Sequence, residues 1–343
     1  MRVFEGYQRG VNLGGWLSQC VSMDEAHFDT FITEADIARI AGWGLDHVRL
    51  PIDCDVVFAG MDGAPGERMR HVDDCVAWCE RHGLRLILDL HKTYGYMFDS
   101  AVVPDPDAFF TDPTLQDAFL RLWQTLARRY GSLPGRVAFE LLNEVTNPAQ
   151  AANWNRIAAR AMDAVRALAP DSWILVGGVY NNSVTSVPLL APPRDGRVVY
   201  NFHCYEPLVF THQAAGWVRG MTPDFTMAYP APLDAYRQAA AHLGLWQAEP
   251  GAADARLIGP DYFEALFRSA IDYAERQNAP LYCGEYGVID RADPQATLRW
   301  FRDIHSAFAA HGIGRAAWTY KVRDFGLTDP HYDSVRDQLI SLL

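Results

Sequence analysis

Two short segments of the chain each end an apolar run in a glutamate. They are Val137-Ala-Phe-Glu-Leu-Leu-Asn-Glu144 and Pro280-Leu-Tyr-Cys-Gly-Glu285-Tyr-Gly. Removing a carboxylate from water costs free energy, so a glutamate at the end of a buried strand calls for a reason other than packing. A pair of carboxylates that face each other across a pocket is the minimum that glycosidic-bond cleavage requires. The two glutamates therefore point to glycoside hydrolysis.

Other polar and aromatic side chains also stand at the carboxyl ends of predicted strands. They are Arg49, His91, Asn143, His203, Tyr205 and Trp318. Alone, Arg49 would be a structural ion-pair partner as often as a ligand contact, and His91, His203 and Trp318 would more often be core residues. Asn143-Glu144 alone could also mark a helix N-terminus. Their joint occurrence at successive strand ends favours a site, because parallel strands of a barrel bring their carboxyl ends to one face.

Short apolar strands alternate with amphipathic helical patterns along the whole chain. We expect strands at Val11–Trp16, His47–Ile52, Arg85–His91, Val137–Asn143, Trp173–Gly178, Val198–Tyr205, Pro280–Gly284 and Arg315–Tyr320. We expect helices at Glu34–Trp43, Val72–His82, Leu115–Tyr130, Ala149–Leu168, Tyr262–Gln277, Pro294–His311 and Ser334–Leu342. Eight strands with helical crossovers predict an α/β fold, a (β/α)₈ TIM barrel, as one domain over residues 1–343. A doubly wound sheet is the alternative, but it usually carries a Gly-rich phosphate turn that the first strand lacks.

One crossover is too long for a simple loop. Residues 206–259 follow the sixth predicted strand and include Pro- and Ala-rich sequence. Long insertions in compact domains are usually lids or walls of binding sites. We therefore expect this insertion to lie beside the cleft, on the face where barrel loops carry function.

Composition excludes several classes of protein. The net charge of −12 argues against nucleic-acid binding, whose affinity depends largely on Lys and Arg. No apolar run approaches the length of a membrane span, and the six cysteines lack zinc-site spacing. The start of the chain lacks the apolar core of a signal peptide, which predicts a cytoplasmic protein, or an exported one if a leader has been removed.

Glycoside hydrolysis assigns roles to the two glutamates. Arg49, together with a hydrogen bond from Tyr205, would keep Glu285 ionised as a nucleophile. Glu144 would stay protonated as the acid, favoured by a partly apolar setting and by the negative charge of Glu285. His203 is expected to hydrogen-bond near Glu144. Asn143 is placed to contact the sugar 2-hydroxyl, and Trp318 offers a flat apolar face to the ring.

The ordered set of these eight residues resembles glycoside hydrolase family 5, the cellulase-type barrels. Four further segments resemble its compact endoglucanase C subgroup: Gly10-Val-Asn-Leu-Gly-Gly-Trp-Leu-Ser-Gln, His27-Phe-Asp-Thr-Phe-Ile-Thr-Glu, Phe210-Thr-His-Gln and Trp318-Thr-Tyr-Lys. The resemblance implies a retaining mechanism with Glu144 as acid/base and Glu285 as nucleophile, without metal or organic cofactor. It also implies that residues 206–259 form a small subdomain beside the cleft.

The sequence departs from the family pattern after His91. Lys92 stands where a neutral ring would line the sugar subsites, either as a substrate contact or in an ion pair with Asp89 or Asp99. Aromatic residues nearby or in the insertion are candidates for stacking on sugars, with core packing as the alternative for each. These candidates are Tyr94, Tyr96, Phe98, Trp154 and Trp217.

These observations predict an endo-β-1,4-glucanase of the cellulase or lichenase type, acting on a β-glucan or a β-linked gluco-oligosaccharide. An exo-acting β-glucosidase or a β-1,3-glucanase would use the same mechanism and differ in the loops around the cleft. Two other classes are weaker alternatives. A non-catalytic carbohydrate-binding barrel should have lost a carboxylate, and a metal-dependent hydrolase would use His91 and His203 as ligands.

Overall fold

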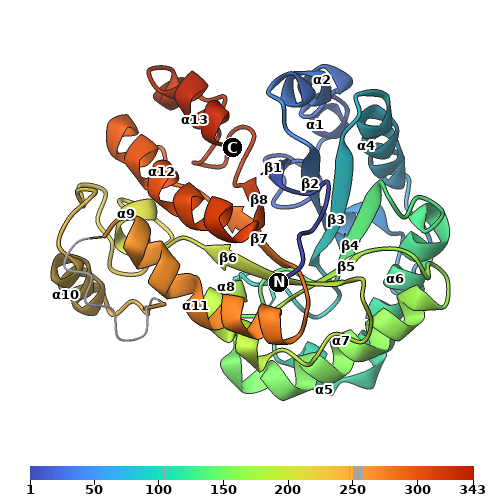
Figure 1. Cartoon of the computed structure of the whole chain (residues 1–343). Helices are drawn as coiled ribbons and strands as arrows, with labels where there is room; N and C mark the ends of the chain where they lie inside the picture. The colour runs from blue at the N-terminus through green and yellow to red at the C-terminus, as the bar shows by residue number, and fades with distance from the viewer. Residues whose placement is uncertain (100, 104, 247, 250–257) are drawn as a thin grey trace.

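Eight parallel strands form a closed barrel in the computed structural model, in chain order and with β1 paired to β8 (Figure 1). The structure describes residues 1–99, 101–103, 105–246, 248–249 and 258–343. The strands are β1 (Arg9–Asn12), β2 (His47–Asp53), β3 (Arg85–Lys92), β4 (Val137–Glu140), β5 (Ile174–Gly177), β6 (Val198–Cys204), β7 (Leu281–Tyr286) and β8 (Gly314–Ala317). The predicted (β/α)₈ TIM barrel is confirmed.

Helices surround this barrel (Figure 1). They are α1 (Glu25–Thr30), α2 (Glu34–Gly42), α3 (Cys54–Val57), α4 (Met69–Arg81), α5 (Ala108–Thr111), α6 (Pro113–Tyr130), α7 (Ala151–Arg166), α8 (Val179–Asn182), α9 (Leu208–Thr211), α10 (Leu233–Leu243), α11 (Pro260–Arg276), α12 (Pro294–His311) and α13 (Arg336–Leu342). The crossover from β5 to β6 has only α8 and a 3₁₀ segment, Val184–Leu189, instead of a long helix. This short connection lies at the carboxyl end of β5, where it reaches the site.

Helix α6 illustrates how the sequence builds the outer layer. It begins at Pro113, and the preceding Asp112 side chain accepts a hydrogen bond from the Thr114 amide, so its first turn is capped. One apolar face of the helix packs on the barrel. There the indole of Trp123 is fully buried, lies against Phe139 of β4, and donates a hydrogen bond to the Leu141 carbonyl at 3.0 Å.

Strand ends differ from the sequence prediction at functionally relevant places. The strand expected to reach Asn143 ends at Glu140, and the strand expected to reach Tyr320 ends at Ala317. Past β4 the chain leaves the ladder, and Glu144 adopts a left-handed φ of 29°. Apolar periodicity did not reveal this turn, because Leu141 and Leu142 are as buried as residues within the strand.

The insertion at residues 206–259 connects β6 to α11 and includes α9 and α10, which lie together beside α11 in Figure 1. Its described part packs on itself: Gln213 exchanges hydrogen bonds with the Met227 backbone, and the Tyr236 hydroxyl donates to the Ala228 carbonyl. Residues 247 and 250–257 of the insertion lie outside the described residues. Its role as a subdomain flanking the cleft stays a prediction.

Among the residues that the structure describes, no helix combines the length and the apolar character that a bilayer span requires.

The burial of Trp123 predicts a large effect on stability. Trp123→Ala removes a fully buried indole and leaves a cavity, so we expect the free energy of unfolding to fall by about 3–5 kcal/mol. Trp217→Ala is the matched control, because the Trp217 side chain is 57% exposed and its loss should cost less than about 0.5 kcal/mol. Urea denaturation of the two variants measures the difference. Equal denaturation midpoints would contradict the packing described here.

Candidate active site

Glu285, at the carboxyl end of β7, is held by two donors. Arg49 Nη1 donates to Glu285 Oε1 at 2.7 Å, and the Tyr205 hydroxyl donates to Glu285 Oε2 at 3.0 Å. The Glu285 side chain is only 7% exposed, so these bonds replace most of its hydration. Both donors favour the ionised carboxylate, which is the form that a nucleophile requires. The predicted contacts of Arg49 and Tyr205 with Glu285 are both present.

Arg49 is completely buried and binds several other groups besides Glu285. Its Nε and Nη2 donate to the two carboxylate oxygens of Glu140 at 2.7 and 2.8 Å, in a bidentate pair. Asp89 lies 3.0 Å from Nη2 on the other side. Burial works against the charge of Arg49, but these carboxylates raise its pKa well above the usual value. The guanidinium therefore stays charged and is fixed in the floor of the barrel mouth.

Glu144 lies opposite Glu285 in a different setting. His203 Nδ1 lies 2.7 Å from Glu144 Oε1, and the amide Nδ2 of Asn181 donates to Oε2 at 3.1 Å. Burial raises the pKa of Glu144, and the Asn181 hydrogen bond only partly opposes this. Burial also lowers the pKa of His203 to about 4, so His203 is neutral at neutral pH. This environment favours a protonated Glu144, as a general acid requires.

The two glutamates are close enough to act on one bond. One carboxylate oxygen of Glu144, one ring nitrogen of His203 and one carboxylate oxygen of Glu285 all lie within 4.8 Å of one another. Carboxyl groups of retaining glycosidases stand about 5–5.5 Å apart, whereas inverting enzymes leave about 6.5–9.5 Å for a water molecule. The separation fits direct attack by one carboxylate while the other donates a proton.

His91 and Trp318 form one wall of the site. Their rings stack with centroids 5.9 Å apart, and the indole of Trp318 is 6% exposed. His91 Nδ1 bonds to Asp89 at 2.7 Å, and Gln19 Nε2 lies 3.1 Å from His91 Nε2. A Cβ atom on Gly14 would lie 2.7 Å from the Trp318 ring, which explains the glycine at that position. His91 thus packs against the indole and is itself fixed by Asp89 and Gln19.

Lys92, one of the predicted subsite residues, forms an ion pair. Lys92 pairs with Asp55 at 2.6 Å, so the expected partners Asp89 and Asp99 were wrong. Asp55 lies in α3, directly after β2, which runs beside β3. Sequence spacing did not reveal this neighbour.

Two of the aromatic candidates belong to the core. Tyr96 is fully buried, and its hydroxyl donates to the Glu144 carbonyl at 2.6 Å, so it supports the acid's backbone and presents no face to a sugar. Trp154 is buried and donates to the Gly177 carbonyl. Tyr94 packs half-buried on the core, Phe98 lies edge-on to His91, and Trp217 is exposed in the insertion. For these last three, sugar stacking stays a prediction.

Several polar residues of the site were not singled out from the sequence. Glu140 was visible as a charged residue inside an apolar strand, and Asp89 lies two residues before His91 on the same strand face. Asn12 accepts a hydrogen bond from Arg49, and Asn201 donates to Glu140. Asn181 gave no sequence signal, because it lies in a loop without periodicity.

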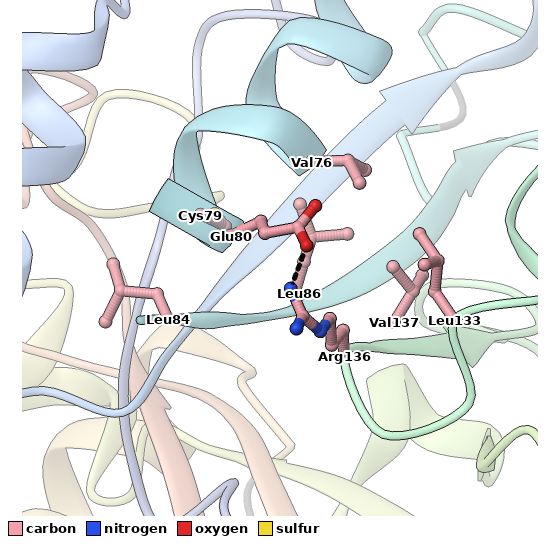
Figure 2. A pocket seen from close by; sticks show the side chains of 8 residues that line it. All are labelled: Val76, Cys79, Glu80, Leu84, Leu86, Leu133, Arg136 and Val137. Carbon is pink, nitrogen blue, oxygen red and sulfur yellow. Dashed lines mark hydrogen bonds and ion pairs between the residues drawn. The ribbon is translucent and has the colours of Figure 1, made fainter. Parts of the chain in front are cut away.

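A small cavity between α4 and the start of β3 and β4 lies away from this site (Figure 2). Apolar side chains line most of it, and an ion pair between Glu80 and Arg136 stands at its edge. It lies at the amino ends of the strands, opposite to the catalytic face of a barrel. Its volume of about 10 Å³ accommodates one water molecule at most.

Comparison with known proteins agrees with this geometry. A family model described as cellulase (glycosyl hydrolase family 5) matches residues 8–324. The chain belongs to glycosyl hydrolase family 5. It is therefore an enzyme that hydrolyses glycosidic bonds, and the non-catalytic barrel is rejected.

Individual relatives within family 5 extend the match. Cellodextrinase A of Ruminococcus flavefaciens is 41% identical over 90% of this chain and 84% of its own length. Endoglucanase C of Acetivibrio thermocellus is 35% identical over 98% of both chains. The solved structure of a hyperthermophilic endo-β-1,4-glucanase in complex with substrate has a TM-score of 0.75, with 20% identity over 95% of this chain and 92% of that one. This last likeness concerns the fold.

The raised pKa of Glu144 predicts the alkaline side of the pH profile. A general acid works only while protonated, so kcat/KM should fall as pH rises through the pKa of Glu144, above the range of an ordinary glutamate. Glu144→Gln should remove this alkaline limb and lower kcat/KM on cello-oligosaccharides by about 10²–10⁴-fold.

A pH–rate profile of wild type, Glu144→Gln and the surface control Glu275→Gln measures both effects. The Glu275 side chain is 53% exposed, so its variant should match wild type. An alkaline limb that persists in Glu144→Gln would assign the acid to another residue.

Proposed function

We propose that this protein is a retaining endo-β-1,4-glucanase that cleaves β-glucans and β-linked gluco-oligosaccharides by double displacement. One observation carries the proposal: two glutamates within reach of each other stand in opposite environments. Arg49 and Tyr205 donate to Glu285, which favours the ionised form, whereas burial favours protonated Glu144. Glu285 would attack the anomeric carbon while Glu144 protonates the leaving oxygen. Glu144 would then act as base toward the water that releases the sugar.

The β-1,4 preference is supported by the two relatives. One is named a cellodextrinase and the other an endoglucanase, and each aligns with this chain over at least 90% of its length. A mixed-linkage β-glucan contains the same β-1,4 bond and would be a substrate as well. The exo-acting β-glucosidase and the β-1,3-glucanase differ from this proposal in the products that they release.

Product chain lengths test the proposal. The purified protein should release a mixture of short oligosaccharides from lichenan and from cellohexaose, and should leave laminarin almost unchanged. Glucose as the first and only product would favour a β-glucosidase, and rapid cleavage of laminarin would favour a β-1,3-glucanase. Glu285→Gln is the control: it should lower activity by roughly 10⁴-fold or more while still binding cellohexaose. Unchanged hydrolysis in this variant would contradict the role of Glu285.

Chelation tests the metal-dependent alternative. Among the described residues, Glu144, His203 and Glu285 bring possible ligand atoms within 4.8 Å of one another, and His91 is not part of this group. Because the proposed chemistry needs these same groups for proton transfer and attack, activity should survive dialysis against EDTA. Loss of activity that zinc restores would reverse this conclusion.

A further inference from the structure

The short connection after β5 contains three consecutive residues in the left-handed backbone conformation. Tyr180, Asn181 and Asn182 have φ values of 54°, 56° and 54°. Residues other than glycine adopt this conformation at a cost, although Asn tolerates it better than most. Three strained residues in a row are stable only where the surrounding structure fixes them. This segment, which we call the 180–182 triplet, lies beside the catalytic acid.

Contacts on several sides hold the 180–182 triplet in place. The Asn181 amide N–H donates to the Val145 carbonyl at 3.0 Å, next to Glu144. A Cβ atom on Gly177 would lie 2.3 Å from Asn182 Oδ1, so the glycine at this position makes room for the Asn182 side chain. The ring of Tyr180 stacks on Trp246 of the insertion, with centroids 4.7 Å apart and planes 15° apart. The triplet thus connects the insertion to the residue after the acid.

One asparagine contacts Glu144, and the other contacts His203, the histidine that lies against Glu144. Asn181 Nδ2 donates to Glu144 Oε2, and Asn182 Nδ2 lies 3.4 Å from His203 Nε2. A donor at Nε2 leaves the His203 proton on Nδ1, which faces Glu144 Oε1. Each oxygen of the Glu144 carboxylate therefore has its own donor, one from β6 and one from the triplet. Two donors on separate oxygens fix the orientation of the carboxyl plane as well as the position of the carboxyl group.

We propose that Asn181 is a positioning residue that orients the Glu144 carboxyl group for proton transfer. This inference rests on the proposed function, because it assigns Asn181 a role through the acid of that mechanism. Asn181 acts mainly in the glycosylation step. As the leaving oxygen takes the proton from Glu144, the carboxylate that forms accepts the hydrogen bond from Asn181. The bond is thus stronger after proton transfer than before, which accelerates the step.

Asn181 acts among other charged and titratable groups. Those that face Glu144 come from β2, β3, the loop after β3, β6, the residue after β6, and β7. They are Arg49, Asp89, His91, Tyr96, His203, Tyr205 and Glu285. All of these stay in place when only the Asn181 side chain changes. The side chain of Asn181 is exposed at the cleft, so water weakens its bond in the free enzyme. A bound substrate that covers it would strengthen the bond.

Two variants isolate the amide donor from the backbone conformation. Asn181→Gly removes the donor and accepts φ > 0 freely, and Asn181→Asp keeps the shape but replaces the donor by a negative charge. Losing a donor to the ionised form makes Glu144 a weaker acid. The alkaline limb of kcat/KM should therefore move up by roughly half to one pH unit in Asn181→Gly, and further in Asn181→Asp.

Substrates with different leaving groups distinguish a positioning role of Asn181 from a general loss of activity. Cellotetraose needs protonation of its leaving oxygen, whereas 2,4-dinitrophenyl β-cellobioside does not. In Asn181→Gly, kcat/KM on cellotetraose should fall by about tenfold, and on the dinitrophenyl substrate by less than about twofold. Asn278→Gly is the matched control, because Asn278 is an exposed asparagine with φ 49° on another face of the fold. It should leave both substrates and the pH profile unchanged.

Three results would overturn the inference. An alkaline limb identical to that of wild type would mean that Asn181 does not act on Glu144. Equal losses on both substrates would make Asn181 a structural or sugar-binding residue. A wild-type enzyme that cleaves the dinitrophenyl substrate but not cellotetraose would overturn the proposed function, and the inference with it. The first two results leave the proposed function intact.

Discussion

The ion pairs of one buried arginine hold the site together. Arg49 has no exposed surface, yet it contacts carboxylates of β3, β4 and β7, namely Asp89, Glu140 and Glu285. A buried charge is tolerable only when it is paired, and here each partner depends on the same guanidinium. Burial raises the pKa of Asp89 to about 7. It also raises the pKa of Glu140, so several carboxylates depend on one cation. Loss of Arg49 would remove the cation from all three carboxylates at once.

This arrangement gives Glu285 and Glu144 different partners. Glu285 contacts Arg49 directly, whereas the side-chain carboxyl of Glu144 has only the neutral groups His203 and Asn181 as hydrogen-bond partners among the described residues. Glu140, four residues before Glu144, accepts both parallel hydrogen bonds of the guanidinium. Glu140 therefore takes two of the hydrogen bonds that the arginine can donate, and Glu144 follows in the left-handed turn beyond β4. Glu285 therefore has a cation beside it, and Glu144 has none among its hydrogen-bond partners.

The fold and the polar residues near strand ends could be predicted from the sequence, because apolar runs alternate with helical patterns along the chain. Apolar runs ending near His91, Asn143 and Glu285 are visible in the sequence, Arg49 stands inside another, and eight such runs predict a barrel. Contacts that depend on loop geometry left no such signal. Asn181 reaches Glu144 through a left-handed segment, and Asp55 reaches Lys92 from the short helix after β2. Tyr96 is fully buried although it lies in a loop. Aromatic residues in loops carry no period that tells a sugar platform from a core residue.

Trapping the covalent intermediate tests the central claim most directly. The enzyme would be incubated with 2,4-dinitrophenyl 2-deoxy-2-fluoro-β-cellobioside, whose fluorine slows release of the sugar, and then digested for peptide mass spectrometry. If Glu285, held by Arg49 and Tyr205, is the nucleophile, the added mass of the sugar should be found on the peptide that contains Glu285. A label on Glu144, or an enzyme that turns over without any covalent adduct, would contradict the division of roles between the two glutamates.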